Sequence, residues 1–331
     1  MTYSIIVAVY NRPDEMEELL ESLVGQTFTD FEVVVVEDGS TRSSRSVCNS
    51  FADRLSISYF EKENSGPGPS RNYGCERARG DVFIFVDSDV MVPPHWLASI
   101  EAHRSSLDAF GGSDREHASF TVMQKAISYA MTSIFTTGGI RGGKVRVGGT
   151  FHPRSFNMGI SRAVYDRTGG FAPMRFGEDV DLSMRIIEGG FTTGLIQDAW
   201  VFHKRRTDLK KFFRQVFNSG MARINLGIRH PRSTKLVHFF PSAFTSYIVI
   251  AAFYAIVLPI GYWTLVPVAL YFLIIALHAT IKNRSVVVGA LSVAASFVQL
   301  TGYGLGFLAG IWKRHVLGKG EEYAFGKTFY R

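Results

Sequence analysis

Cysteine is scarce in this sequence, which has only Cys48 and Cys75 among its 331 residues. The two cysteines show no metal-ligand spacing, so neither a disulfide framework nor a structural zinc site is expected, and unpaired thiols are consistent with a reducing compartment. The first eleven residues carry no basic flank and match an apolar strand, so a secretory signal peptide is not expected. With no internal repeats or low-complexity tracts, the first 205 residues suffice for one α/β domain.

Charge is missing from two long stretches near the C-terminal end. Residues 239–281 and 286–312 contain no Asp, Glu, Lys or Arg and are rich in aliphatic and aromatic side chains. Runs of about 20 apolar residues are long enough to cross a bilayer. Pro259 and Gly261 divide the first stretch. The sequence therefore predicts a transmembrane region at residues 239–315, with spans at 240–258, 262–281 and 286–312, followed by a C-terminal tail at 316–331.

The orientation of these spans is less direct to predict. Basic residues gather before the first span, between the second and third, and after the third. The first two groups favour a cytoplasmic catalytic domain and a returning hairpin. Three full crossings would place the last group outside, so the third segment is either re-entrant or an exception to the rule. Gly302, Gly306 and Gly310 recur every four positions in it, which predicts close packing on a neighbouring helix.

The segment that joins the two parts, residues 206–238, is basic and aromatic. Lys210, Lys211 and Arg214 alternate with phenylalanines, as in an amphipathic helix that lies on an anionic membrane surface. A basic and aromatic pattern also occurs in nucleic-acid-binding proteins. No nucleic-acid motif is present, so we expect membrane lipids and no nucleic acid as partners. The net charge of +7 follows from these basic groups.

An apolar run in the first hundred residues ends in two carboxylates. Residues 82–86 are all apolar, and Asp87 and Asp89 follow directly. Such a run is typical of a buried parallel strand, and open α/β sheets bind ligands beyond the carboxyl ends of their strands. Two carboxylates repel each other unless a cation lies between them, and hard oxygen ligands suit Mg²⁺ or Mn²⁺. The motif predicts a divalent-metal site that also holds a diphosphate; a polar strand end that caps the next helix is the alternative.

The residues before this motif alternate between strand and helix patterns, which favours a doubly wound sheet. Apolar runs occur at residues 4–9, 31–36 and 57–60, and an amphipathic helix is expected at 14–24. Each strand delivers polar groups to the same edge. We expect Asp38 to accept a hydrogen bond from a nucleobase and Arg71 to face phosphate, although ordinary turn chemistry explains either residue alone.

Together these motifs, in this order, resemble the family 2 inverting glycosyltransferases of the GT-A fold. The matching segments are Ser4-Ile-Ile-Val-Ala-Val-Tyr-Asn11, Gln26-Thr-Phe-Thr-Asp-Phe-Glu-Val33, Glu37-Asp-Gly-Ser40, Arg71-Asn72, Asp87-Ser-Asp89, Asn157-Met-Gly-Ile-Ser161, Gly169-Gly-Phe171 and Gly177-Glu-Asp-Val-Asp-Leu182. The resemblance implies an α/β, Rossmann-like GT-A domain over residues 1–205, followed by an α-helical membrane domain. It also implies a nucleotide-diphospho-sugar donor and transfer with inversion at the anomeric carbon.

The resemblance also implies roles for single residues. The base and ribose pocket would be lined by Ala8, Val9, Tyr10 and Asp38, with Arg71 near the base or a phosphate and Asp87 at the ribose. Asp89 would bind the metal. Asp179, which follows Glu178, would be the catalytic base. In some relatives a histidine at the position of His203 completes the metal sphere; a packing role is the alternative. The Glu178-Asp179 pair precedes an amphipathic stretch, so it is expected at a helix N-terminus, where negative charge is favourable; an N-cap role is the alternative.

We therefore expect a membrane-anchored glycosyltransferase, with a divalent cation as cofactor, that acts at the cytosolic face on a lipid-linked or glycan acceptor. A processive polysaccharide synthase is disfavoured, because its Gln-x-x-Arg-Trp motif is represented only by Gln215, with Asn218 and Ser219 following. A non-catalytic membrane scaffold is disfavoured by the complete carboxylate set. Residues 111–149 are glycine-rich without periodicity and are expected to form an acceptor loop.

Overall fold

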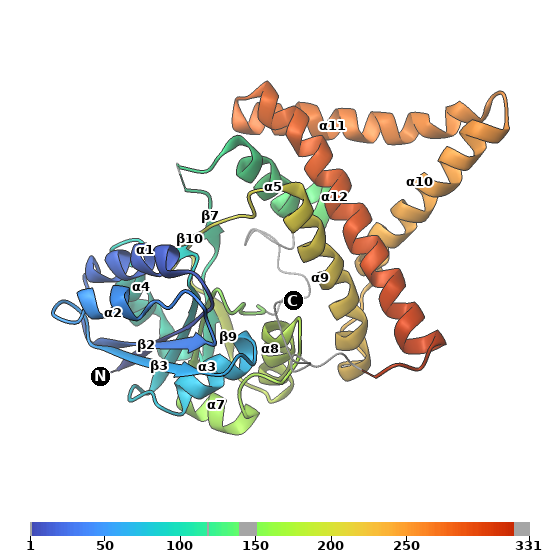
Figure 1. The fold of residues 1–331 in the computed structure, drawn as a ribbon. Helices are drawn as coiled ribbons and strands as arrows, with labels where there is room; N and C mark the ends of the chain where they lie inside the picture. The colour runs from blue at the N-terminus through green and yellow to red at the C-terminus, as the bar shows by residue number, and fades with distance from the viewer. Residues whose placement is uncertain (1, 118, 139–150, 321–331) are drawn as a thin grey trace. The chain divides into compact units, whose positions relative to one another are not determined.

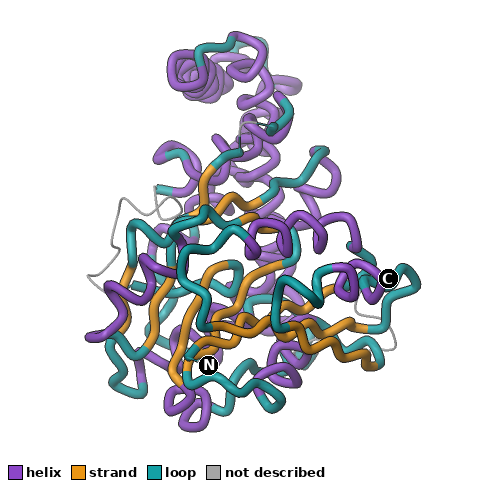
Figure 2. Tube along the Cα trace, turned by 90° about the vertical axis from the view of Figure 1, so that its left-hand side faces the viewer, coloured by secondary structure: helices purple, strands orange, loops and turns teal. Residues whose placement is uncertain are grey.

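The computed structural model describes residues 2–117, 119–138 and 151–320. They form two compact units: residues 2–117 and 151–204 belong to the first, and residues 119–138 and 205–320 to the second (Figure 1). All strands of the described residues lie in the first unit, whereas the second consists of helices and their connections (Figure 2).

A seven-stranded sheet forms the centre of the first unit, in the order β3-β2-β1-β4-β8-β6-β9. The first four strands are parallel: β1 (Tyr3–Val9), β2 (Phe31–Asp38), β3 (Ile57–Lys62) and β4 (Val82–Asp87). The sheet continues through β8 (Asn157–Ser161), β6 (Ala109–Gly111) and β9 (Thr193–Leu195); β8 runs antiparallel to both of its neighbours. The predicted parallel strands are thus confirmed for β1 to β4, whereas the sheet as a whole contains both parallel and antiparallel pairs.

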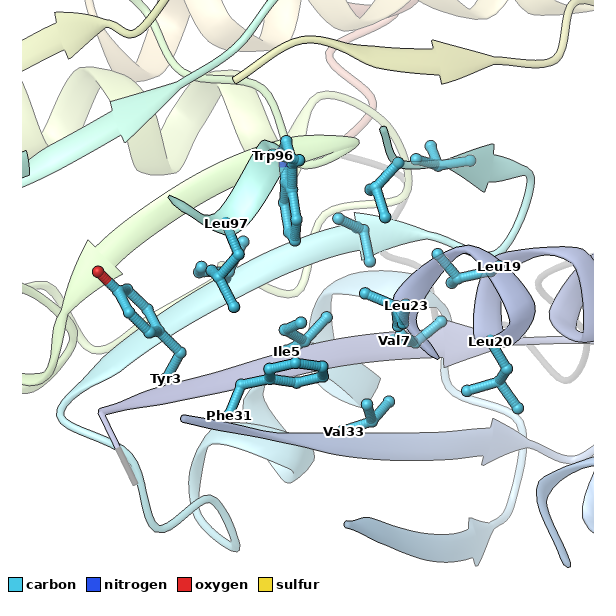
Figure 3. Packing of buried hydrophobic residues seen from close by; sticks show 14 of the residues in the cluster. Tyr3, Ile5, Val7, Leu19, Leu20, Leu23, Phe31, Val33, Trp96 and Leu97 are labelled. Atoms are coloured by element: carbon cyan, nitrogen blue, oxygen red, sulfur yellow. The ribbon is translucent and has the colours of Figure 1, made fainter. Parts of the chain in front are cut away.

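Both faces of the sheet are buried, which explains why its parallel strands are continuously apolar rather than alternating. One face packs against α1 (Pro13–Val24), α2 (Arg45–Ser50) and α4 (Trp96–His103), the last followed by the short η1 (Arg104–Ser106). The other packs against α3 (Pro67–Cys75), α7 (Arg162–Thr168) and α8 (Glu178–Glu188). Figure 3 shows the leucines of α1 beside Val7 of β1 and Val33 of β2, with Trp96 and Leu97 of α4 on the same face of the sheet. Cys48 and Cys75 are free and buried.

The strand register aligns the polar strand ends. Ala8 is paired with Asp87 and Val9 with Glu37, so the residues that follow β1, β2 and β4 emerge side by side. A second, three-stranded sheet is formed by β5 (Val90–Met91), β10 (Val201–His203) and β7 (Asp114–Arg115). In it His203 pairs with Val90. This pairing carries a histidine from far along the chain to the end of β4.

The second unit contains three helices that are long and apolar enough to cross a membrane, at Leu236–Val257, Gly261–Asn283 and Val286–Val316. Its elements are α5 (Val122–Thr132), α6 (Ile134–Thr137), α9 (Leu209–Arg229), η2 (Leu236–His238), α10 (Phe240–Val257), η3 (Gly261–Leu265), α11 (Val266–Asn283), α12 (Val286–Ile311) and η4 (Trp312–Val316). The three helices agree with the predicted spans to within a few residues. The last eleven residues of the predicted tail lie outside the described residues.

Two expectations need correction. Within the stretch expected to be a loop, α5 and α6 form helices, and the signal was readable, because Thr121 and Gln124 make a capping box at the start of α5. Residues 139–149 of that stretch lie outside the described residues. These helices belong to the second unit, so the first is not the continuous domain 1–205 that we expected.

The basic segment also differs from the expectation. It forms the predicted helix, α9, but Phe212 and Val216 on its apolar face are fully buried against α5 and α12. That face is therefore used within the protein rather than left to lie on lipid, because α5 and α12 offer an apolar surface on which it can be buried.

Glycines allow α9 and α12 to pack with their backbones in contact. A methyl group at Gly306 would lie 2.0 Å from the carbonyl oxygen of Phe217, and one at Gly220 would lie 2.2 Å from that of Tyr303. Methyl groups added at Gly302 and Gly310 would lie 2.6 and 2.9 Å from side-chain atoms of α9. The predicted small-residue seam is thus confirmed, and its neighbour is α9.

We expect Gly306→Ala to destabilise the second unit by about 1–3 kcal/mol, because the added methyl forces the two backbones apart. Gly320→Ala is the matched control, since no atom lies within 4 Å of the methyl it would add. Thermal unfolding of the full-length protein in detergent measures both. Equal melting temperatures for the two variants would show that the seam yields without cost.

Candidate active site

Asp87, Asp89 and His203 lie together at the end of β4. One potential ligand atom from each residue lies within 4.8 Å of the others, and His203 Nε2 is 3.2 Å from Asp89 Oδ1. The imidazole of His203 stacks on Phe156, with ring centroids 5.0 Å apart, which holds its orientation. Two carboxylates and an imidazole fit Mn²⁺ or Mg²⁺, so the structure brings together the three residues that the sequence singled out.

Arg12, which the sequence reasoning missed, lies against the same cluster. Its Nη1 is 2.8 Å from Asp89 Oδ2 and 2.9 Å from Glu15 Oε2. Arg12 lies in the turn after β1. Its position beyond a strand end could therefore have marked it in the sequence as a residue of the site. Because Asp89 is only 8% exposed, a nearby positive charge offsets the cost of burying its carboxylate. A metal ion at Asp89 would compete with this guanidinium.

Arg71 connects the metal-type cluster to the carboxylate pair on α8. Its Nη2 donates to Asp87 Oδ1 at 2.7 Å and its Nη1 to Glu178 Oε1 at 3.1 Å. Its guanidinium also lies over the ring of Phe171, 5.2 Å from the centroid. Arg71 is 4% exposed, and its Nε has no hydrogen-bond partner among the described residues. One buried donor is therefore still available to a ligand.

Glu178 and Asp179 begin α8, as predicted. Gly177, with a φ of +85°, precedes them in the left-handed conformation that turns the chain into the helix. Both carboxylates are buried. Arg154 Nε donates to Asp179 Oδ2 at 2.6 Å, and the backbone amide of Val180 donates to Oδ1 at 2.8 Å. Asp179 is thus held by a cation on one side and by the helix start on the other.

The two neighbours have opposite pKa shifts. Burial works to raise the pKa of Asp179, but the charge and hydrogen bond of Arg154, with the charge of Arg71, outweigh it and lower that pKa. Burial and then the negative charge of Asp179 raise the pKa of Glu178, against the opposing effect of Arg71. Two adjacent carboxyls with diverging pKa values are typical of a site that uses one of them as an ionised group at neutral pH. Arg154 gave no sequence signal that we recognised.

Asp38 is occupied by its own loop. Its Oδ1 is 2.9 Å from Lys62 Nζ and 2.8 Å from the amide of Ser65, and its Oδ2 accepts from the amide of Gly66 at 2.8 Å and from Asn64 Nδ2 at 3.3 Å. A carboxylate has about four acceptor positions, so these donors use its capacity. Asp38, 1% exposed, holds the turn that leads into α3.

The strand end at Ala8, Val9 and Tyr10 lies beside Asp87 through the β1–β4 pairing. Val9 is 2% exposed as a whole residue and belongs to the core under α1. Ala8 and Tyr10 are partly exposed. The ten residues that the sequence named thus lie at or just beyond the ends of β1, β2 and β4, in α3, in β10 and at the start of α8, and the structure adds Arg12 and Arg154.

Comparison with known proteins identifies the family. The family model "Glycosyl transferase family 2" matches residues 4–169, half of the chain. The chain belongs to glycosyl transferase family 2. An uncharacterised glycosyltransferase of Rickettsia typhi is 37% identical over 92 residues, which is 28% of each chain. The Staphylococcus aureus poly(ribitol-phosphate) beta-N-acetylglucosaminyltransferase TarS is 37% identical over 115 residues, 32% of this chain and 20% of TarS. The chain thus spans well under half of these relatives.

A solved structure supports the fold. The mannosyltransferase PcManGT from Pyrobaculum calidifontis, determined in complex with GDP-Man and Mn²⁺, superposes with a TM-score of 0.62 and 20% identity, covering 90% of this chain and 86% of that one. The expected GT-A-like α/β domain followed by C-terminal helices is therefore confirmed.

We expect Asp89→Asn to weaken Mn²⁺ binding at least tenfold, because it removes the most buried anionic ligand of the cluster, and His203→Gln to weaken it less. Arg12→Gln should strengthen Mn²⁺ binding, because it removes a positive charge that competes for Asp89. Isothermal titration of the full-length protein with Mn²⁺ alone measures all three. Unchanged Mn²⁺ affinity in Asp89→Asn would show that the metal does not bind at this cluster.

Proposed function

We propose that this protein moves a sugar from a nucleotide-diphospho-sugar to an acceptor hydroxyl or phosphate, with inversion at the anomeric carbon. The observation that carries the proposal is the buried Asp179, which pairs with Arg154 and follows Glu178, the residue that Arg71 joins to the Asp87–Asp89–His203 cluster. Inverting transfer needs one base for the acceptor proton and one cationic group for the leaving diphosphate. The linked groups supply both.

Donor binding rests on the polar edge of the sheet. The backbone at Ala8 and Val9, with the ring of Tyr10, lines the nucleoside side, and Asp38 shapes the pocket by holding the turn before α3. Asp87 faces the ribose, and the free Nε of Arg71 is placed to donate to base or phosphate. Asp89 and His203 hold a divalent cation, Mg²⁺ or Mn²⁺, which when bound neutralises charge on the diphosphate.

Asp179 acts as the base. As the acceptor oxygen attacks the anomeric carbon from the face opposite the diphosphate, the acceptor proton passes to Asp179 Oδ, the glycosidic bond forms, and the nucleoside diphosphate leaves with the bonding electron pair. Arg154 keeps Asp179 ionised and oriented before the attack. Glu178 contributes by holding Arg71.

The acceptor is a lipid-linked sugar, a polyprenyl phosphate or a glycan at the cytosolic face of the membrane. Three apolar helices in the same chain support a membrane anchor, and the basic residues before the first helix and between the second and third support this orientation. They would concentrate the enzyme at the surface where such acceptors lie.

The proposal is tested by incubating the full-length protein in liposomes with a panel of nucleotide-sugars, with and without lipid-phosphate acceptors. We expect turnover with one donor, a product of single-sugar length, and an anomeric configuration opposite to that of the donor by NMR. Retention of configuration excludes the mechanism, and a long polymer would identify a processive synthase. No turnover with any donor favours a scaffold.

Asp179→Asn should lower turnover by about 10²–10⁴-fold while donor binding survives, because it keeps the shape and removes the base. Glu178→Gln is the companion variant and should affect donor binding through Arg71 more than it affects the chemical step. Rates at saturating donor and donor affinity by titration separate the two effects. Turnover of Asp179→Asn within a few fold of the wild type would move the base to another residue.

Arg154→Gln should shift the acid limb of the kcat/KM profile to higher pH by about one unit or more, since the nearby cation that lowers the pKa of Asp179 is lost. In the wild type the depressed pKa keeps Asp179 ionised at neutral pH, and activity falls only as pH drops through that low value. Arg54→Gln, which removes a cation from the exposed pair with Glu21, is the control and should leave the limb in place. If the acid limb of the kcat/KM profile of Arg154→Gln lies at the same pH as that of the wild type, Asp179 is not the group that titrates there.

A further inference from the structure

Arg223 of α9 is a buried cation that pairs with no carboxylate of the residues that the structure describes. It is 8% exposed, and burial lowers its pKa. Its Nη2 donates to the hydroxyl of Ser233 at 2.5 Å, and its Nε has no partner among the described residues. A buried guanidinium is costly unless it is paired with an anion. A single neutral hydroxyl does not provide that pairing.

Among the described residues of the second unit, Asp208 is the one carboxylate. From residue 209 to residue 320 the chain contains no Asp or Glu, and residues 118–145 contain none either. The nearest carboxylate along the chain, Asp208, caps the opposite end of α9, where it accepts from the amide of Lys211 at 2.7 Å. Fifteen residues of helix separate it from Arg223, which is about 22 Å. The side chain of Asp208 therefore cannot neutralise Arg223.

Other polar groups gather around Arg223. The charges of Arg223 and Lys235 both act on His238 in η2, and Tyr303 of α12 interacts electrostatically with Arg223. Ser233 and Lys235 directly precede the first candidate span, which begins at Leu236. The result is a positively charged polar cluster at the end of an apolar helix.

Large apolar side chains begin where this cluster ends. Leu236 is 89% exposed, and Phe239 and Phe240 are each 46% exposed. An amphiphile with an anionic head and a hydrocarbon tail would match both parts, whereas a free anion would use only the first. Phosphate suits the planar, forked donors of a guanidinium, and lipid surfaces present it at this depth.

We propose that Arg223, with Ser233, Lys235 and His238, binds the phosphate headgroup of a lipid at the entrance to the first span. The inference rests on the membrane part of the proposed function, but it concerns a site separate from the catalytic groups. Its test uses binding without a donor, so it can fail while the transferase activity stands, and the reverse.

The test measures the melting temperature of the full-length protein in maltoside micelles with phosphatidic acid, with diacylglycerol, or with inorganic phosphate at equal ionic strength. We expect phosphatidic acid at about 100-fold its Kd to raise the melting temperature by about 5 °C. Diacylglycerol, which lacks the phosphate, should not raise it. An equal rise with inorganic phosphate at the same concentration would overturn the lipid assignment and make the ligand a soluble phosphate.

Variants assign the effect to Arg223. Arg223→Gln should be at least as stable as the wild type in lipid-free micelles, because it removes an unpaired buried charge, and it should lose the rise with phosphatidic acid. Arg214→Gln, on an exposed position of the same helix, should keep the full rise. Arg223→Lys, which keeps the charge but not the fork, should show a smaller rise. No rise in the wild type, or the same rise in all variants, overturns the proposal.

Discussion

The buried guanidinium of Arg71 is the interaction on which the rest of the active site depends. It lies between Asp87 at the end of β4 and Glu178 at the start of α8, and so joins the central sheet to the helix that carries the base. Without it, three acidic groups would face one another in a largely buried region. Because burial penalises unpaired charge, the carboxylates keep their places only while the arginines between them stay.

Arginines and carboxylates alternate across the site. Arg12 contacts Asp89, Arg71 contacts Asp87 and Glu178, and Arg154 contacts Asp179. Arg154 lowers the pKa of Asp179, whereas burial and the negative charge of Asp179 raise the pKa of Glu178 against the effect of Arg71. An anionic donor and a metal ion would enter a network whose positive and negative groups are already in position, which reduces the reorganisation that binding requires.

The second unit follows a different rule, because its described residues carry almost no negative charge to pair with their basic groups. Its packing comes from glycines that let α9 and α12 approach backbone to backbone, and from phenylalanines of α9 that are buried against α5 and α12. In such a unit Arg223 stands out as a buried cation that donates its hydrogen bond to a neutral hydroxyl. Burial of the Arg223 guanidinium costs free energy that an anionic ligand beside it would offset.

The sequence by itself determined the strands, the family and the apolar helices. Continuous apolar runs such as residues 82–86 indicate strands buried on both faces, and stretches without charge indicate the C-terminal helices, because each is a local property of the chain. Motifs in the right order were enough to name Asp87, Asp89, Arg71 and Asp179. Helix α5 was missed although its capping box was local, since a glycine-rich surrounding masked it.

Tertiary structure alone decided which charges meet. Arg154 is 25 residues from Asp179 and Arg12 is 77 residues from Asp89, and no periodicity links positions so far apart. The contacts that Asp38 makes with Lys62 and with the amides of Ser65 and Gly66 also depend on the fold. The sequence placed α9 on the membrane surface, whereas the fold buries the apolar face of that helix against α5 and α12. Partner choice depends on which surfaces the whole chain brings into contact, and a local pattern of residue types does not contain that information.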